Sequence, residues 1–276
     1  MKEAERRGPG TRRKRERRPP ETDRVVLTEK IDIGREVRIE GPPLEALRFQ
    51  GARPGSIVTV TDVMGRDYRG RVVSLATKAS VLIFEAFKAP TESRFEMVLL
   101  QALPKKERME LIIQKTTELG VSAIIPFKAE RSICLEQREA RQQKAHRWQE
   151  IAIKAAKQSR RARVPGIAKY CSMEEALCTC GEGLRILLWE REGRTLKDVL
   201  QNYFVNRVRS ALPASLPEIS RIYGMVGPEG GFTEKEVGLA QEKGFIPVKL
   251  GQRILRTETA AIVLVGIVQY ELGDLG

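Results

Sequence analysis

The chain is short of histidine and cysteine. Its 276 residues contain one histidine and four cysteines, and the cysteines do not form CxxC pairs. So few potential zinc ligands argue against a metal cluster. Serine or cysteine nucleophiles activated by histidine would all depend on His146, which lies in a charged stretch with a helical pattern. We therefore expect free thiols, no bound metal and no histidine-based catalytic triad.

Long apolar runs are also missing. No stretch reaches the about 18 to 20 consecutive apolar residues of a membrane span, and the N-terminus is too charged for a signal peptide. We expect a cytoplasmic protein that does not bind membranes. Acidic residues are outnumbered by basic ones, 36 to 49, which gives a formal net charge of +13. This excess favours a polyanionic partner such as RNA, the alternative being a merely basic surface.

The pattern of residues divides the chain into three parts. Residues 1–24 have almost no large apolar side chain, which predicts a disordered basic arm that either attracts phosphates or simply aids solubility. Residues 25–90 alternate short Val- and Ile-rich segments with turn residues, which predicts a small β-barrel. Residues 91–276 alternate strand and helix patterns, which predicts an α/β domain with a mainly parallel sheet.

A glycine-rich segment, "GPEGGFTEKEV" at 227–237, follows the apolar strand pattern of 221–226. Ligands of open α/β sheets bind beyond the carboxyl ends of strands, and glycine lets the main chain approach them closely. Thr233 and Glu236 fit a capping box for the next helix. The segment lacks the spacing of a P-loop or of a dinucleotide fingerprint, so neither is indicated. The alternative is a plain strand-to-helix turn.

A second segment, "LGQRILRTETAA" at 250–261, combines apolar residues with an arginine, a carboxylate and hydroxyls where a helix should begin. Its alternative is an N-capped core helix with Arg256 in a surface ion pair. Together the two segments predict a cradle for a neutral or zwitterionic ligand, held largely by main-chain atoms.

In this order and spacing, the two segments resemble the RsmE family, SPOUT-class methyltransferases that modify uridine N3 in 16S ribosomal RNA. The resemblance continues in "KKERMELIIQKTTELGVSAIIPFKAERS", "RWQEIAIKAAKQSRRARVP" and the closing "GDLG", and it covers roughly Phe95 to the C-terminus. It implies a C-terminal α/β domain with a deep trefoil knot, a smaller N-terminal PUA-like β-barrel that binds RNA, and a homodimer. S-adenosylmethionine (SAM) would be the cofactor, and 16S rRNA or the small ribosomal subunit the substrate.

The resemblance also implies roles for single residues. Main-chain groups would bind the adenine edge, and Leu250, Ile254 and Leu255 would pack on its ring. Arg256 would stabilise charge on the uridine carbonyl oxygens, and Glu258 would orient Arg256 or accept a proton through water. The full set of cofactor-binding positions is Leu188, Gly227, Pro228, Glu229, Gly230, Gly231, Leu250, Gly251, Ile254, Leu255, Arg256 and Thr259.

RNA contacts are implied at two places. Gln158, Arg160 and Arg161 match a glutamine and arginine of the family pattern, the alternative being a polar helix end. In the barrel, Arg48 and Arg53 are candidates, but the histidine that usually precedes this stretch is missing from "PPLEALRFQGARPG". This departure implies either that the barrel contacts RNA differently or that the preferred nucleotide differs. The alternatives are a SPOUT enzyme acting on another RNA such as tRNA, and a non-catalytic ribosome-binding factor.

Overall fold

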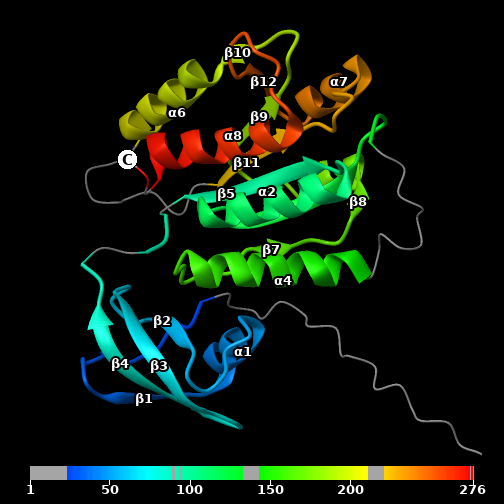
Figure 1. The fold of residues 1–276 in the computed structure, drawn as a ribbon. Coiled ribbons are helices and arrows are strands. Elements are labelled where there is room, and N and C mark those ends of the chain that lie inside the picture. The colour runs from blue at the N-terminus through cyan, green and yellow to red at the C-terminus, as the bar shows by residue number, and fades with distance from the viewer. Residues whose placement is uncertain are drawn as a thin grey trace, which may run out of the picture.

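The computed structural model describes residues 24–88, 91–93, 95–132, 143–210, 221–273 and 275. These residues form a small antiparallel module, at the bottom of Figure 1, and a larger α/β domain above it. Nearly all of the basic arm expected at 1–24 lies outside the described residues. Within them, no helix is long and apolar enough to span a membrane, and no group of three or more His, Cys, Asp or Glu is placed to hold a metal ion.

The N-terminal module is a four-stranded antiparallel sheet in the order β1-β4-β3-β2, with one helix, α1, against it. Its core contains Val37 and Ile39 of β1, Val81 and Ile83 of β4, and Leu47 of α1. The sequence indicated the strands but not α1, because Gly-Pro-Pro is typical of a turn; proline is nevertheless well tolerated in the first turn of a helix. The elements are β1 (Glu36–Ile39), α1 (Gly41–Phe49), β2 (Ile57–Thr61), β3 (Asp67–Leu75) and β4 (Ala79–Ala86).

The larger domain contains the expected parallel sheet, in the order β10-β12-β9-β11-β5-β6-β7, with β8 also paired to β6. The register sets Tyr223 of β11 beside Val98 of β5 and Arg185 of β9, so β11 lies inside the sheet. The strands are β5 (Glu96–Ala102), β6 (Ala123–Lys128), β7 (Gly166–Ile167), β8 (Cys171–Ser172), β9 (Leu184–Leu188), β10 (Arg194–Thr195), β11 (Arg221–Val226) and β12 (Ile246–Lys249).

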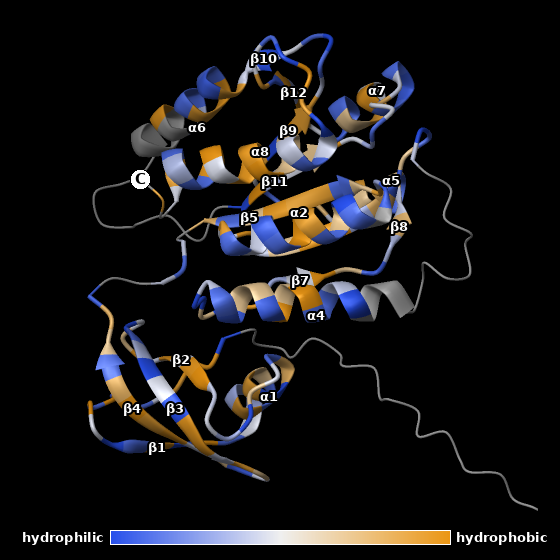
Figure 2. Ribbon diagram, in the orientation of Figure 1, coloured by the Kyte–Doolittle hydropathy of each residue, from blue (hydrophilic) through white to orange (hydrophobic). Residues whose placement is uncertain are grey.

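Helices cover both faces of this sheet, so its central strands carry apolar residues on both sides. Leu99 of β5 faces one core, which includes residues of α2, α4, α6 and α8. Val98 and Leu100 of the same strand face the other core, with α5 and α7. Figure 2 shows the resulting orange stripes on these elements. The helices are α2 (Lys106–Glu118), α4 (Gln143–Gln158), α5 (Met173–Cys178), α6 (Leu196–Ser210), α7 (Glu234–Glu242) and α8 (Thr257–Leu272).

The two parts are joined by direct contacts as well as by the chain. Phe49 at the end of α1 is buried in the core of the larger domain. The Gln50 side-chain amide donates a hydrogen bond to the carbonyl of Ala162 (3.2 Å), and Lys157 Nζ donates to the carbonyl of Gly51 (2.8 Å). The module is therefore anchored at the C-terminal end of α4.

Glu96, at the start of β5, lies between two arginines. Its carboxylate accepts a hydrogen bond from Arg221 Nε (2.6 Å) and pairs with Arg163 Nη2 (3.3 Å). Burial alone would raise the pKa of Glu96, but the Arg221 hydrogen bond and the charges of Arg163 and Arg221 outweigh it and lower the pKa below 4.5. A carboxyl whose pKa is lowered in the folded state stabilises the fold at pH values above its ordinary pKa. This stabilisation is lost as the pH falls through the folded-state pKa.

We expect Glu96→Gln to lower the melting temperature at pH 7, because both arginines lose their carboxylate. The difference from wild type should begin to shrink below about pH 4.5. It should disappear as the pH falls through the lowered pKa of folded Glu96, because the wild-type carboxyl is then protonated as well. Thermal unfolding followed by circular dichroism from pH 7 to pH 3 measures this. The control is Glu234→Gln, whose pair with Arg191 is exposed and should add little at any pH. A Glu96→Gln difference that stays constant with pH would contradict the assignment.

Candidate functional site

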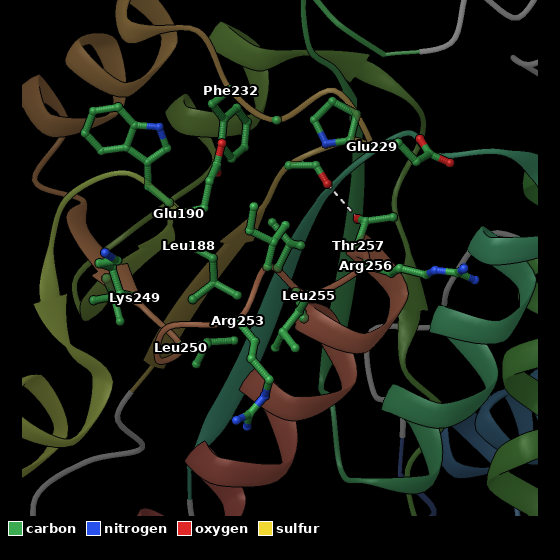
Figure 3. Close-up of a pocket in the computed structure, with 18 of the residues that line it drawn as sticks. Leu188, Glu190, Glu229, Phe232, Lys249, Leu250, Arg253, Leu255, Arg256 and Thr257 are labelled. Atoms are coloured by element: carbon green, nitrogen blue, oxygen red, sulfur yellow. Dashed lines mark hydrogen bonds between the residues drawn. The ribbon is translucent and has the colours of Figure 1, made fainter.

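The carboxyl ends of β9, β11 and β12 open into a cavity of about 340 Å³. Its walls are formed by residues 188–190, 226–232 and 248–257, together with Arg108 and Ala260. The volume is within the range of small-molecule sites, about 300 to 1,000 Å³. The two segments singled out in the sequence, glycine-rich and arginine-containing, therefore meet around one hollow (Figure 3).

Small residues shape the loop that follows β11. Gly231 has φ +69°, a backbone conformation that favours glycine, and its N–H donates to the carbonyl of Pro228 (3.0 Å). A Cβ on Gly227 would lie 3.2 Å from the ring of Phe232, and one on Gly231 would lie 3.1 Å from Glu190 Oε1. The predicted capping box between Thr233 and Glu236 is confirmed, and it starts α7 directly after the loop.

A buried hydrogen-bond relay ties the two loops together. Thr257 Oγ1 donates to the carbonyl of Gly227 (2.6 Å; Figure 3), and the side-chain amide of Gln101 donates to Thr257 Oγ1 (3.1 Å). Gln101 on β5 is fully buried and Thr257 is 6% exposed. The start of α8 is therefore fixed against the end of β11. The sequence did not single out Gln101, although an amide in an otherwise apolar strand is a usable signal for such a network.

Glu229 anchors the glycine loop to α2. Its Oε1 accepts a hydrogen bond from the backbone N–H of Lys105 (3.0 Å) and forms an ion pair with Arg108 Nη1 (3.2 Å). Lys105 is the N-cap of α2 and provides no side-chain cap itself, so Glu229 supplies one from a distant part of the chain. In Figure 3 its side chain points away from the leucines of the cavity.

Leucines line one part of the cavity, where the charged side chains of Glu190, Lys249 and Arg253 also lie. Leu188, Leu250 and Leu255 lie close together in Figure 3, whereas Arg256 extends away from them toward α2. Ile254 lines the rim and is 85% exposed. All the expected cofactor-binding positions line the cavity except Thr259. Thr259 is exposed on the first turn of α8, and Ala260, one residue further round the helix, takes its place at the wall.

Glu258 does not line the cavity, and it pairs with Arg108 instead of the expected Arg256. Its side chain is 13% exposed, and Oε2 lies 3.8 Å from Arg108 Nε. That oxygen is buried and has no hydrogen-bond partner within the described part of the chain. The structure thus sets Glu258 against Arg108 of α2, rather than against Arg256 as the sequence suggested. Arg108 escaped attention because no spacing links it to the C-terminal segments.

The RNA candidates lie away from the cavity, since none of the five lines it. Arg53, Gln158 and Arg160 are exposed. Arg48 is exposed too, and its Nη2 donates to the carbonyl of Ala76. Arg160 has φ +62° although it is not glycine.

Arg161 is a correction. Its side chain is 6% exposed and is paired with Glu92 (2.7 Å). Its Nη1 also donates to the carbonyls of Thr117 (3.0 Å) and Val121 (2.8 Å). The guanidinium therefore binds Glu92, in the segment between the two parts of the chain, and two carbonyls of the larger domain. Bound in this way, it is not available to contact RNA.

Comparison with known proteins identifies the family. Residues 91–269 match the model of the RNA methyltransferase domain. The Ribosomal RNA small subunit methyltransferase E of Bacillus subtilis (strain 168) is 34% identical over 194 residues, 70% of this chain and 73% of that protein. The protein of the same name from Mycobacterium bovis is 29% identical over 86% of this chain and 87% of its own length.

The fold agrees with these sequences. A crystal structure of Ribosomal RNA small subunit methyltransferase E from Neisseria gonorrhoeae, bound to S-adenosyl methionine, has 32% sequence identity and a TM-score of 0.63. The match covers 91% of this chain and 98% of that one. The resemblance found in the sequence is thereby confirmed, and this chain belongs to the RNA methyltransferase family that includes the Ribosomal RNA small subunit methyltransferase E proteins.

Proposed function

We propose that the protein transfers a methyl group from SAM to N3 of a uridine in 16S rRNA. The observation that carries the proposal is the cavity where the loops after β11 and β12 meet, fixed by the Thr257–Gly227 hydrogen bond. The SAM-bound relative from Neisseria gonorrhoeae supports the choice of cofactor. The proposal places the protein in the cytoplasm, with the small ribosomal subunit.

The residues of the cavity fit SAM. The leucine side chains offer an apolar wall for a flat ring, and the glycine loops expose main-chain donors and acceptors for its polar edge. The charged side chains that line the cavity suit a ligand with a carboxylate and an ammonium group. When bound, SAM supplies an electrophilic methyl group on a sulfonium whose departure needs no further activation.

The protein's own task is therefore positioning and electrostatics. Holding acceptor and donor in line removes much of the entropic barrier. Arg256, exposed at the N-cap of α8 and lining the cavity, would donate hydrogen bonds to uracil carbonyl oxygens as negative charge develops there. Glu258 would act through Arg108, because Arg108 is its charged neighbour.

We infer that the larger domain has the knotted SPOUT topology and the small module a PUA-like barrel. Two features support the knot. The segment from Leu250 to Arg256 passes beside the loop after β11, and Thr257 is bonded to that loop. For the barrel, Val25 and Leu27 pair with Thr61 at the β2 edge by main-chain hydrogen bonds, and both side chains join the core of the module.

We infer that the protein is a homodimer that uses α8. This helix keeps Ile262, Val263 and Ile267 half-buried and Tyr270 64% exposed. An apolar helix side that its own chain does not fully cover is suited to a second copy. Light scattering of the purified protein should give twice the mass of one chain, and Tyr270→Glu should shift it toward one. A wild-type protein that stays monomeric at micromolar concentration would refute the inference.

The methylation test uses purified protein, SAM with a labelled methyl group and small ribosomal subunits that lack the modification. We expect label in 16S rRNA and 3-methyluridine among its nucleosides by mass spectrometry. Label in tRNA alone would favour the alternative RNA target. Calorimetric binding of SAM without transfer to any RNA would favour the non-catalytic ribosome-binding factor.

Arg256→Ala separates catalysis from cofactor binding in the same assay. We expect kcat to fall by about 100- to 1,000-fold, the usual effect of losing one preorganised donor. The affinity for SAM should be nearly unchanged, because the leucine wall and the main chain remain. Full turnover by Arg256→Ala would remove this residue from the proposal.

Arg160 offers a test of RNA contact that does not damage the fold. A non-glycine residue in the left-handed region costs about 1 to 2 kcal/mol, so arginine is not there for the sake of the backbone. Arg160→Gly should leave the melting temperature unchanged or raised, yet weaken RNA binding, most strongly at low salt. The control Lys243→Ala removes an exposed positive charge after α7. Equal effects of the two variants on RNA affinity would show that only net charge matters.

A further inference from the structure

Arg108 is a charged side chain at the cavity that two carboxylates of this chain already hold. It lies on the first turn of α2, lines the cavity and is 29% exposed. Its Nη1 is 3.2 Å from Glu229 Oε1, and its Nε is 3.8 Å from Glu258 Oε2. One guanidinium is thus flanked by carboxylates from two other elements, the loop after β11 and α8.

The two carboxylates do more than neutralise one cation. The three side chains together carry a formal net charge of −1, and Glu258 Oε2 is buried and has no hydrogen-bond partner among the described residues. Burying an under-satisfied carboxylate is unfavourable, and a surplus of negative charge is not needed merely to hold an arginine in place. The arrangement instead fixes a long, flexible side chain at the cavity, with remaining N–H donors for a ligand.

The position of Arg108 matches the acceptor rather than the cofactor ring. The leucine wall suits adenine, so the acceptor base is placed at the part of the cavity away from the leucines and toward α2. Arg256 extends toward α2 on that side (Figure 3), and α2 carries Arg108. Arg108 of α2 and Arg256, the N-cap of α8, both line the cavity, and the acceptor is placed between them.

We propose that Arg108 donates a hydrogen bond to one of the two carbonyl oxygens that flank N3 of the acceptor uracil, while Arg256 serves the other. The inference rests on the proposed function and deepens it. N3 forms a bond to the methyl carbon as the carbon–sulfur bond breaks, its electron pair goes to sulfur, and the N3 proton leaves to water. Negative charge is shared by both flanking oxygens before the bond forms, so two cationic donors stabilise it better than one.

The same pair explains the choice of base. Cytosine has an amino group where uracil has its O4 carbonyl, and an amino group presents donors to a guanidinium that also has only donors. With Arg108 and Arg256 at the two positions that flank N3, the site accepts uracil and disfavours cytosine. Glu229 and Glu258 are positioning residues for Arg108 in this account, since each carboxylate pairs with its guanidinium.

The experiment measures kcat, KM for the small subunit and SAM affinity of Arg108→Ala, Arg108→Lys and Glu229→Gln. Arg147→Ala is the matched control. Arg147 lies on α4 and pairs with Glu110 of α2, the helix that carries Arg108, but it does not line the cavity. We expect Arg108→Ala to lose about 100- to 1,000-fold in kcat with SAM affinity nearly kept. Added guanidinium should restore part of its activity, ammonium at equal ionic strength should not, and Arg108→Lys should fall between.

A purely structural role predicts a different pattern. Arg108→Ala would then behave like Glu229→Gln, which loosens the loop, and both would lose SAM affinity without rescue by guanidinium. That pattern, or unchanged kcat in Arg108→Ala, would overturn the assignment. Absence of methyl transfer by the wild-type protein would instead reject the proposed function, so the two failures are distinguishable.

Discussion

The hydroxyl of Thr257 is the contact on which the site depends. It donates to the carbonyl of Gly227 and accepts from Gln101, so three elements, β5, the end of β11 and the start of α8, meet at one buried oxygen. Buried polar groups of this kind are costly when unpaired, about 1 to 3 kcal/mol each, so the relay specifies one arrangement of the two loops. The cavity exists because the apolar and charged segments are held in this register.

Other contacts fix the parts of the molecule around this hydroxyl. The sheet, buried on both faces, fixes where the three strand ends lie, and Glu229 ties the glycine loop to α2. The small module is held at the C-terminal end of α4 by Phe49, Gln50 and the Glu92–Arg161 pair. The RNA candidates Arg48, Arg53, Gln158 and Arg160 thus lie apart from the cavity within one chain. A dimer would allow a second copy to bring them to it.

Much of this could be predicted from the sequence because it is written in local patterns. Apolar runs predicted the parallel strands, Thr233 and Glu236 predicted the capping box, and the helix expected to begin within 250–261 begins at Thr257. What could not be predicted depends on contacts between distant residues. Arg108 and Gln101 approach the C-terminal loops only in the folded chain. Arg161 illustrates the opposite error, because an arginine near a helix end has the same sequence signature whether it faces RNA or a buried glutamate.

The central claim is that a main-chain pouch fixed by Thr257 holds the sulfonium donor. Calorimetric SAM affinity of Thr257→Val tests it most directly, with Thr257→Ser as the control that keeps the hydroxyl. Valine matches threonine in shape but removes the donor to the Gly227 carbonyl and one of the two acceptors of the Gln101 amide. We expect affinity to fall by more than about tenfold, corresponding to about 1.4 kcal/mol, while Thr257→Ser stays near wild type. A folded Thr257→Val protein that binds SAM as tightly as wild type would contradict the account.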